Sequence, residues 1–417
     1  MIGSICMLST HGYFDAVPQL GRTDTGGQVV YVLEVAKALG RRGHRVDIYT
    51  RWFDSAKGQI EAVPGAPNVR IVRVRSGPWE FIPKEQIYDV LPELSRTMVE
   101  FIREERLQYD LFHGHYVDAG IVTLDVAKAL ERPAIFTPHS LGAWKREEMG
   151  GDPEEMERVF RFKHRVAEEL RVFKTVEGLL LTTEVQREKL AELYGWQGGN
   201  MGVIPPGVDI DAFRPLKPGE GRGAAKLPPR YILTLSRIDS NKGHDLLLNA
   251  FDIVRKEVPG VDLVIGGGSP EPRGTEMEVV ASMRRIIEER GMEGTVRIIG
   301  YVPDEDLVPS YQWAEMFVLP SIFEPFGMTA LEAMACGKTV VASRLGGIRE
   351  VISSGENGLL VDPSDAGEFA DAMIAVLKGP QGAAQMGKEG RRTVEQRFSW
   401  DAIAERHVAF YEQSIRG

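Results

Sequence analysis

The chain has 417 residues, of which 43% are apolar and 26% charged, and its 50 basic and 60 acidic residues give a net charge of −10. This size predicts two or three domains with cores of their own, and the acidic balance argues against nucleic acid or an anionic membrane as a partner. Cys6 and Cys336 lie far apart, which indicates neither a disulfide framework nor a zinc site. No apolar run approaches the roughly 20 residues needed to cross a bilayer, and the start of the chain lacks the features of an export signal. We therefore expect a cytoplasmic enzyme.

Short apolar runs alternate with helical patterns along the chain, which is typical of α/β proteins with parallel sheets. The first helix is expected at residues 28–39, where apolar positions from Val29 to Leu39 share one face. Arg41, Arg42 and Gly43 then supply a basic last turn and a glycine stop. The strands expected in this half are residues 2–8, 45–50, 69–74, 111–113, 134–136, 178–181 and 203–204.

A charge-rich segment, residues 152–174, is expected to form one long helix whose charged residues mostly face solvent. Residues 205–229 are dense in Pro and Gly and have no periodic pattern, which predicts an interdomain linker. The later strands are expected at residues 231–235, 261–265, 296–299, 316–319, 339–342 and 359–361, with a last helix at 401–414. Two doubly wound domains joined in this way are expected to hold an active site in the cleft between them, at the carboxyl ends of their strands.

Two glycines mark the start of the first helix. Gly26, Gly27 and Gln28 follow the tripeptide Thr23-Asp24-Thr25. Glycines let a ligand approach the backbone closely, and a helix start offers free N–H groups to an anion. The dinucleotide pattern G-x-G-x-x-G is not present here. A plain tight turn between strand and helix explains the glycines equally well.

Two cations follow the first strand of the second half. Arg237 leaves this strand, and Lys242 lies five residues later, just before a helix. Cations at such a turn suit a diphosphate whose negative charge grows as it leaves. The alternative is a pair of solvated loop cations.

The most specific pattern runs from Ile322 to Gly337. Glu324 lies in the loop after the strand at 316–319, Gly327 shapes the turn, and Glu332 lies in the following helix. A carboxylate accepts hydrogen bonds from vicinal sugar hydroxyls, and the N–H groups from Gly327 onward are suited to phosphate. The alternative is a loop carboxylate and an exposed helical glutamate.

Three histidines follow strands, namely His113, His115 and His139. Histidines at strand ends are expected to face the cleft, where they can bind a substrate by hydrogen bonds or transfer a proton. No helical H-E-x-x-H pattern or cysteine partner accompanies them, so a metal site is not indicated. For each of them taken singly, a structural, hydrogen-bonded histidine is the favoured interpretation.

The combination of G-G-Q, R-x4-K and E-P-F-G-x4-E-A resembles the retaining glycosyltransferase family 4, which has the GT-B fold of two Rossmann-like domains. The resemblance extends from Ser9 to about Arg397. The chain is most similar to the sucrose-phosphate and mannosylfructose-phosphate synthase group, through the segments STHGYFD, LGRTDTGGQVVYVLEVAKAL, VDIYTRWF, FIPKE, TPHSLGAWKREEM and VIPPGVD. The resemblance implies an acceptor-binding domain at 1–210 and a nucleotide-sugar-binding domain at 211–397. It also implies that a C-terminal helix, 398–417, packs back on the first domain.

The resemblance also implies residue roles. Catalytic and donor-binding roles fall on Arg237 and Lys242 (diphosphate), Glu332 (ribose), Glu324 (transferred sugar), Phe326, Gly327 and Met328 (backbone contacts), His139 (donor sugar) and Gly27. Acceptor-binding roles fall on Gly27 and Gln28, and on Lys84, Lys145 and Arg165 for the acceptor phosphate. Cations that converge from separate segments suit a dianionic phosphate better than one exposed contact. The alternative is that these are three of the 50 basic residues.

The function implied is hexosyl transfer, with anomeric retention, from a nucleoside diphosphate sugar to a sugar phosphate. GDP-mannose and fructose 6-phosphate are the first expectation, and UDP-glucose with fructose 6-phosphate is the alternative. A sucrose synthase-like enzyme would not be expected to keep the three phosphate-binding cations. A non-catalytic nucleotide-sugar-binding protein and a phosphorylase stay open, although no pyridoxal-phosphate lysine site is found. No metal or cofactor is required by these motifs, with Mg²⁺ an optional stimulant, and a separate sugar phosphatase would have to process the product.

Overall fold

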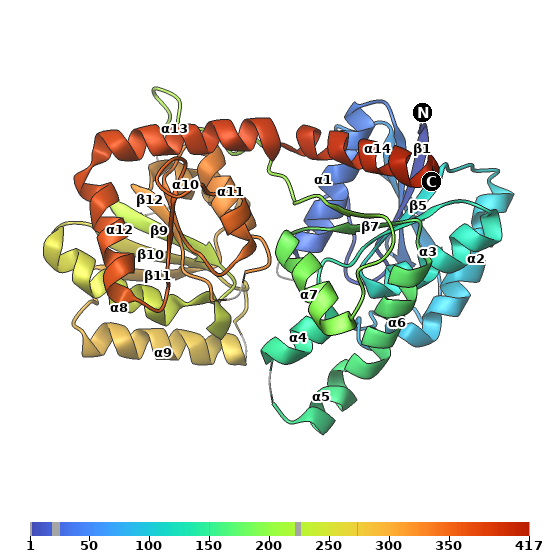
Figure 1. The fold of residues 1–417 in the computed structure, drawn as a ribbon, viewed down its shortest axis with the longest axis horizontal. Coiled ribbons are helices and arrows are strands. Elements are labelled where there is room, and N and C mark those ends of the chain that lie inside the picture. Colours follow the sequence, from blue (N-terminus) through green and yellow to red (C-terminus); the bar gives the residue numbers. More distant parts are fainter. Residues whose placement is uncertain are drawn as a thin grey trace. The chain divides into compact units, whose positions relative to one another are not determined.

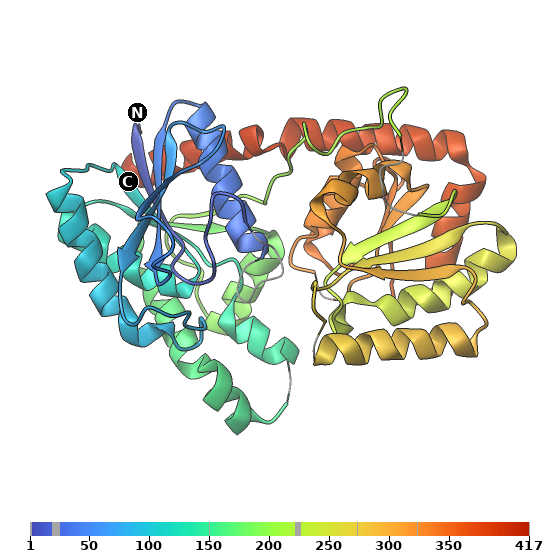
Figure 2. The ribbon, with the colours of Figure 1, turned by 180° about the vertical axis from the view of Figure 1, so that it is seen from behind.

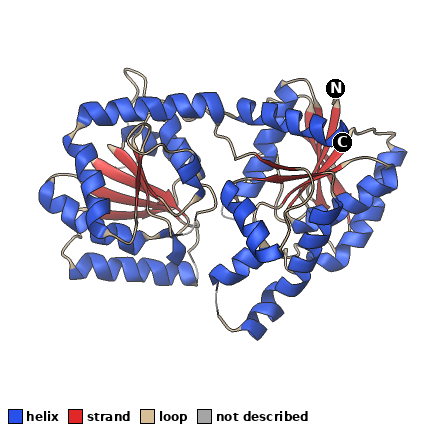
Figure 3. Cartoon of the chain, viewed as in Figure 1, coloured by secondary structure: helices blue, strands red, loops and turns tan. Residues whose placement is uncertain are grey.

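The computed structural model describes residues 2–18, 26–149, 151–221, 227–272, 274–322 and 324–416. The chain divides into two compact units, Met1–Pro205 with Trp400–Gly417, and Pro206–Ser399. Each unit is built around its own sheet, with helices on both faces, as Figures 1, 2 and 3 show. The boundary lies five residues before the expected one at 210/211, and the C-terminal segment belongs to the first unit.

The first unit contains an eight-stranded sheet in the order β3-β4-β2-β1-β5-β6-β7-β8. All pairs are parallel except β3 with β4, which is antiparallel. The short edge strand β3 was not expected, because its three residues are partly or fully exposed and carry no apolar run. The strands are β1 (Ser4–Leu8), β2 (Arg45–Trp52), β3 (Ile60–Ala62), β4 (Val69–Arg75), β5 (Leu111–His115), β6 (Ala134–Thr137), β7 (Gly178–Leu181) and β8 (Met201–Val203).

The helices of the first unit follow the expected pattern in most places. In α1 the buried residues include Val29, Val32, Val35 and Leu39, which are spaced to share one face, and α14 packs against this helix. The helices are α1 (Gly27–Arg41), α2 (Leu91–Glu104), α3 (Val117–Leu130), α4 (Gly142–Met149), α5 (Pro153–Phe160), α6 (Phe162–Thr175), α7 (Glu184–Tyr194) and α14 (Trp400–Arg416), with a 3-10 turn at Ile87–Val90.

The single helix expected at 152–174 is wrong, because two helices occupy this segment. Arg161 adopts a left-handed backbone conformation with φ of 51°, which ends α5 and begins α6 in a new direction. Two charged residues are exceptions to the mostly solvated face, since Arg165 and Glu169 are 4% and 1% exposed. Periodicity alone could not reveal this break, because no Gly or Pro marks it.

The second unit contains a six-stranded parallel sheet in the order β11-β10-β9-β12-β13-β14. Successive residues of β9 face two separate cores, with Leu233 packed among α10, α11 and α13 and Ile232 among α8, α9 and α12. The strands are β9 (Tyr231–Ser236), β10 (Asp262–Gly267), β11 (Val296–Gly300), β12 (Met316–Leu319), β13 (Val340–Ser343) and β14 (Leu359–Val361). The helices are α8 (His244–Glu257), α9 (Thr275–Glu289), α10 (Asp304–Trp313), α11 (Met328–Ala335), α12 (Ala366–Lys378) and α13 (Pro380–Arg397), with 3-10 turns at Ser240–Lys242 and Gly347–Glu350.

The start of the stretch expected to be a linker belongs to the second unit. Val208 is buried in that unit's core, and its backbone N–H donates to the carbonyl of Phe398 at 2.8 Å. Residues 222–226 of this stretch lie outside the described residues. No helix in the described ranges is long and apolar enough to cross a membrane.

Candidate active site

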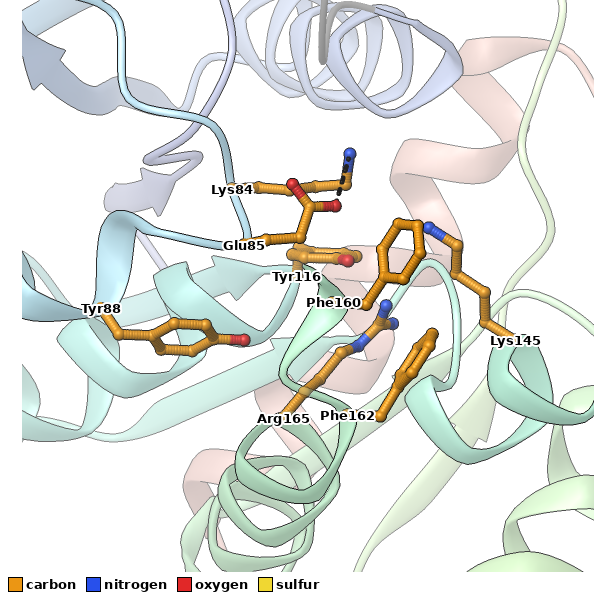
Figure 4. A pocket seen from close by; sticks show the side chains of 8 residues that line it. All are labelled: Lys84, Glu85, Tyr88, Tyr116, Lys145, Phe160, Phe162 and Arg165. Carbon is orange, nitrogen blue, oxygen red and sulfur yellow. Dashed lines mark ion pairs between the residues drawn. The ribbon is translucent and has the colours of Figure 1, made fainter. Parts of the chain in front are cut away.

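A pocket in the first unit, with about 220 Å³ of empty space that is partly open to solvent, brings together the three cations that the sequence suggested for an acceptor phosphate (Figure 4). Lys84 precedes the 3-10 turn at Ile87–Val90, Lys145 lies on α4, and Arg165 lies on α6. Aromatic rings supply much of the remaining wall, namely Tyr88, Tyr116, Phe160 and Phe162. Sequence positions up to 81 residues apart thus converge on one small site.

The three cations differ in how firmly they are held. Arg165 is the most constrained, since its guanidinium bonds Glu169 and Ser140 and lies 4.6 Å from the ring of Tyr116. The Nζ atom of Lys84 lies 3.4 Å from the carboxylate of Glu85, and that of Lys145 lies 5.5 Å from the ring of Phe160. A buried, bonded arginine with two adjustable lysines is well suited to bind a compact dianion.

The expectation that His113 and His115 face a cleft is wrong. Both lie within β5 and are fully buried, because this strand continues to His115 rather than ending at His113. His113 bonds the hydroxyls of Tyr411 and Thr137 at 2.7 and 2.9 Å. These two histidines are therefore structural in this unit.

His139 occupies a strained position at the end of β6. Its φ of 57° lies in the left-handed region, its ring bonds His115 at 3.0 Å, and its carbonyl accepts from the Gln186 amide at 3.1 Å. Burial, with His11 and His407 nearby, lowers the pKa of His139 to about 3. At neutral pH this imidazole is uncharged, which suits hydrogen bonding better than proton donation.

These histidines lead to a prediction about pH. Burial is the main cause that lowers the pKa of His407 from 6.5 to about 4, so the unfolded chain binds its proton at a higher pH than the folded one. Its stabilising contribution is complete above about pH 6.5 and is lost as the pH falls toward the folded pKa; at about pH 5 the loss is about 2 kcal/mol. We expect His407→Gln to show a smaller drop in melting temperature between about pH 7.5 and pH 5 than the parent chain. An equal drop in both chains would contradict the assignment, and the comparison cancels the contribution of carboxylates common to both.

A histidine and an aspartate that the sequence did not single out form a buried pair. His11 Nδ1 lies 3.0 Å from the carboxylate of Asp118, which also accepts from the Thr10 hydroxyl. The His11 ring packs 4.7 Å from that of Tyr116, a residue of the pocket wall. His11 occurs in the segment STHGYFD of the family resemblance, but 107 positions separate it from Asp118, so no local pattern could join the two.

The helix expected at residues 28–39 is observed as α1, which begins at Gly27. Gly27 is exposed at the first position of this helix. The Gln28 side chain donates to Ser9 Oγ at 3.3 Å and to the His115 carbonyl at 3.2 Å, which fixes its direction within the first unit. The preceding Thr23, Asp24 and Thr25 lie outside the described residues.

In the second unit, Lys242 and Glu324 form an ion pair with Nζ and Oε2 2.7 Å apart. Lys242 is only 5% exposed, so this pair is shielded from solvent. Arg237 differs, with a side chain 77% exposed and its nearest carboxylate, that of Asp239, at 4.0 Å. The structure therefore joins Lys242 to Glu324, and no contact between Lys242 and Arg237 is found among the described residues.

Phe326, Gly327 and Met328, the residues expected to contact the donor through their backbone, lie at the start of α11. The Glu324 carbonyl accepts from Gly347 N–H at 3.0 Å, Phe326 is buried in the core, and Gly327 caps α11 immediately before Met328. The N–H of Ala330 donates to the Gly327 carbonyl at 3.0 Å, and the positive end of the helix dipole at the start of α11 favours an anion.

Glu332 lies one turn further along α11 and is not the exposed glutamate of the alternative interpretation. It is partly buried and accepts a 2.6 Å hydrogen bond from Tyr311. Burial raises its pKa to about 7, and the Tyr311 hydrogen bond opposes this shift.

A run of glycines, Gly266 to Gly268, ends β10 at the carboxyl edge of this sheet and was not singled out from the sequence. A Cβ on Gly267, whose φ is 114°, would lie 1.8 Å from the Ser236 carbonyl oxygen, so only glycine fits there. The sequence G-G-G-S directly after an expected strand was the available signal. Across the described ranges, no group of three or more His, Cys, Asp or Glu side chains could hold a metal ion.

Comparison with known proteins identifies both halves of the chain. Residues 25–212 match Glycosyltransferase Family 4, and residues 221–393 match glycosyl transferases group 1. The mannosylfructose-phosphate synthase of Agrobacterium fabrum is 37% identical, over 98% of this chain and 91% of that protein. A D-inositol 3-phosphate glycosyltransferase of Corynebacterium jeikeium is 33% identical, over 98% and 96%.

A solved structure supports the same assignment. The sucrose-phosphate synthase of Thermosynechococcus elongatus has a TM-score of 0.81 and 29% identity, with 99% of this chain and 98% of that chain covered. Its architecture is that of the GT-B glycosyltransferases, which the two parallel-sheet units reproduce. The chain belongs to glycosyltransferase family 4 and is a glycosyltransferase of the mannosylfructose-phosphate and sucrose-phosphate synthase type.

Proposed function

We propose that this enzyme transfers a mannosyl group from GDP-mannose to fructose 6-phosphate, with retention at the anomeric carbon. The observation that carries the acceptor half of this proposal is the pocket lined by Lys84, Lys145 and Arg165. Lys84 and Arg165 each have a carboxylate beside them, Glu85 and Glu169, and a phosphate could accept charge-assisted hydrogen bonds from all three cations at once. A sugar phosphate supplies that group.

The relatives favour a phosphorylated acceptor. Their names refer to a mannosylfructose phosphate, a sucrose phosphate and D-inositol 3-phosphate. Each contains a phosphate on the acceptor or on the product. The aromatic wall of the pocket strengthens charge-assisted hydrogen bonds to such a group, because it lowers the local dielectric constant.

The donor half of the proposal uses the second unit. Lys242 stabilises the departing diphosphate, together with Arg237 and the N–H groups at the start of α11. Glu324 and Glu332 accept hydrogen bonds from the transferred sugar and the ribose. Protonation of Glu332 near pH 7 would weaken its hydrogen bonds to the ribose hydroxyls. Ribose binding should therefore favour the charged carboxylate.

The first unit contributes the remaining groups. His139 bonds the donor sugar as a neutral imidazole, and Gly27 and Gln28 contact the acceptor. In the proposed mechanism the acceptor hydroxyl attacks from the side on which the diphosphate leaves, and the diphosphate helps to take its proton. The protein then acts mainly by positioning and by stabilising charge.

A second candidate is transfer of glucose from UDP-glucose to the same acceptor. The similarity to a sucrose-phosphate synthase along nearly the whole chain favours it. Nucleotide release with fructose 6-phosphate, measured with GDP-mannose and with UDP-glucose, distinguishes the two. Faster GDP release supports the first proposal, and faster UDP release supports the second. No release with either donor would overturn the acceptor assignment, and D-inositol 3-phosphate is then the next acceptor to assay.

A further inference from the structure

One buried carboxylate lies behind the cationic pocket and touches three of the elements around it. Glu169 is 1% exposed and accepts from Arg165 Nε at 2.8 Å. It also accepts from the backbone N–H of Gly142, at 2.9 and 3.1 Å, and from the Tyr194 hydroxyl. These donors lie on α6, α4 and α7, so a single side chain ties the three helices together.

Each bond to Glu169 bears on a cation of the pocket. Arg165 is bonded directly, and its guanidinium plane is fixed from the other end by Ser140 O and Oγ at 2.9 Å. Gly142 is the first residue of α4, the short helix that carries Lys145. The next residue, Ala143, donates its N–H to the Tyr194 hydroxyl at 3.0 Å, so the start of this helix is held twice.

The packing leaves little freedom in this arrangement. A Cβ on Gly142 would lie 2.8 Å from Arg165 Nε and 2.9 Å from Glu169 Oε2, so the α4 backbone rests against the ion pair itself. Stability alone does not explain such an ion pair well, because a buried salt bridge often contributes no more than well-packed apolar side chains. A charged anchor that sets two cations at a defined spacing explains it better.

We propose that Glu169, together with Tyr194, is a positioning residue for the acceptor phosphate, which holds Arg165 and the start of α4, and through it Lys145, in place. The proposal rests on the proposed function of the pocket. It adds to that function two groups that do not touch the acceptor but determine how tightly the acceptor binds. Groups behind a binding site that hold its contacting side chains commonly decide whether the site is tight or loose.

The test uses Tyr194→Phe in the full-length enzyme, because this change removes one hydroxyl and keeps the ring that packs 5.4 Å from Phe173. We expect the KM for fructose 6-phosphate to rise about tenfold, with kcat and the KM for the nucleotide sugar within about twofold. Inorganic phosphate, used as a competitive inhibitor, should lose affinity by the same factor. A merely structural role would lower the melting temperature and leave both constants unchanged.

A matched control is available in the same unit. The Tyr109 hydroxyl donates at 2.5 Å to Asp47, a buried carboxylate that is also bonded by an arginine, Arg70. Tyr109→Phe therefore removes the same kind of bond away from the pocket, and it should leave the acceptor KM unchanged. If the Glu169→Gln variant folds, it should raise the acceptor KM more than Tyr194→Phe does.

The outcomes separate this proposal from the function on which it rests. If Lys145→Ala raises the acceptor KM and Tyr194→Phe does not, the positioning role is overturned while the pocket keeps its function. If Lys145→Ala has no effect on the acceptor KM, the phosphate assignment itself fails. An equal rise in Tyr194→Phe and Tyr109→Phe would also overturn the proposal, because the effect would then be a general loss of rigidity.

Discussion

Replacing Lys242 with alanine is expected to lower kcat by at least about a hundredfold, since groups that stabilise developing charge typically contribute a factor of this size. Lys242 is nearly buried and paired with Glu324 at 2.7 Å. A cation in such surroundings interacts with a departing diphosphate much more strongly than one in water. The variant also leaves Glu324 without its partner, which adds to the loss. Steady-state kcat with GDP-mannose and fructose 6-phosphate measures the effect, and thermal unfolding shows whether the fold is kept.

The control for this experiment is Lys256→Ala. Lys256 lies on α8 of the same unit, with a side chain that is 63% exposed and paired with Asp252. Its removal changes the net charge equally and is expected to leave kcat unchanged, because exposed ion pairs contribute little. A kcat for Lys242→Ala close to that of the control would remove the diphosphate role.

The second large effect is expected from Lys84→Ala, which should raise the KM for fructose 6-phosphate by about tenfold to a hundredfold, as expected when a charge-assisted hydrogen bond is lost. Lys84 lines the pocket with Lys145 and Arg165 (Figure 4). The rate with unphosphorylated fructose should change little, because that acceptor has no group for the lysine to bind. Initial rates over a range of both acceptors measure this difference.

Lys174→Ala is the matched control, since Lys174 is an exposed residue in the last turn of α6. It removes one positive charge from the same unit outside the pocket. If Lys84→Ala and the control have the same acceptor KM, Lys84 is one more surface cation and the phosphate pocket is wrong. If the rate with fructose falls as much as the rate with its phosphate, Lys84 acts on something other than the phosphate.

Local patterns were sufficient for most of the fold. All thirteen expected strands overlap an observed strand, and the smallest overlap is that of residues 203–204, which share only Val203 with β8. The errors have physical causes. The edge strand β3 has no apolar alternation, and the break at Arg161 depends on a left-handed residue that packing stabilises without a glycine.

The sequence by itself determined the two α/β units, the family and a short set of candidate side chains, because periodicity and motif spacing are local properties of a chain. Only the tertiary structure decided which candidates meet. It brought Lys84, Lys145 and Arg165 to one pocket, joined Lys242 to Glu324, and buried His113 and His115 in a strand. It also revealed Glu169, which the sequence does not distinguish from a solvated helical glutamate. In the structure, Glu169 is buried against Arg165 and the start of α4. Contacts between distant segments depend on how whole elements pack, and no local pattern encodes them.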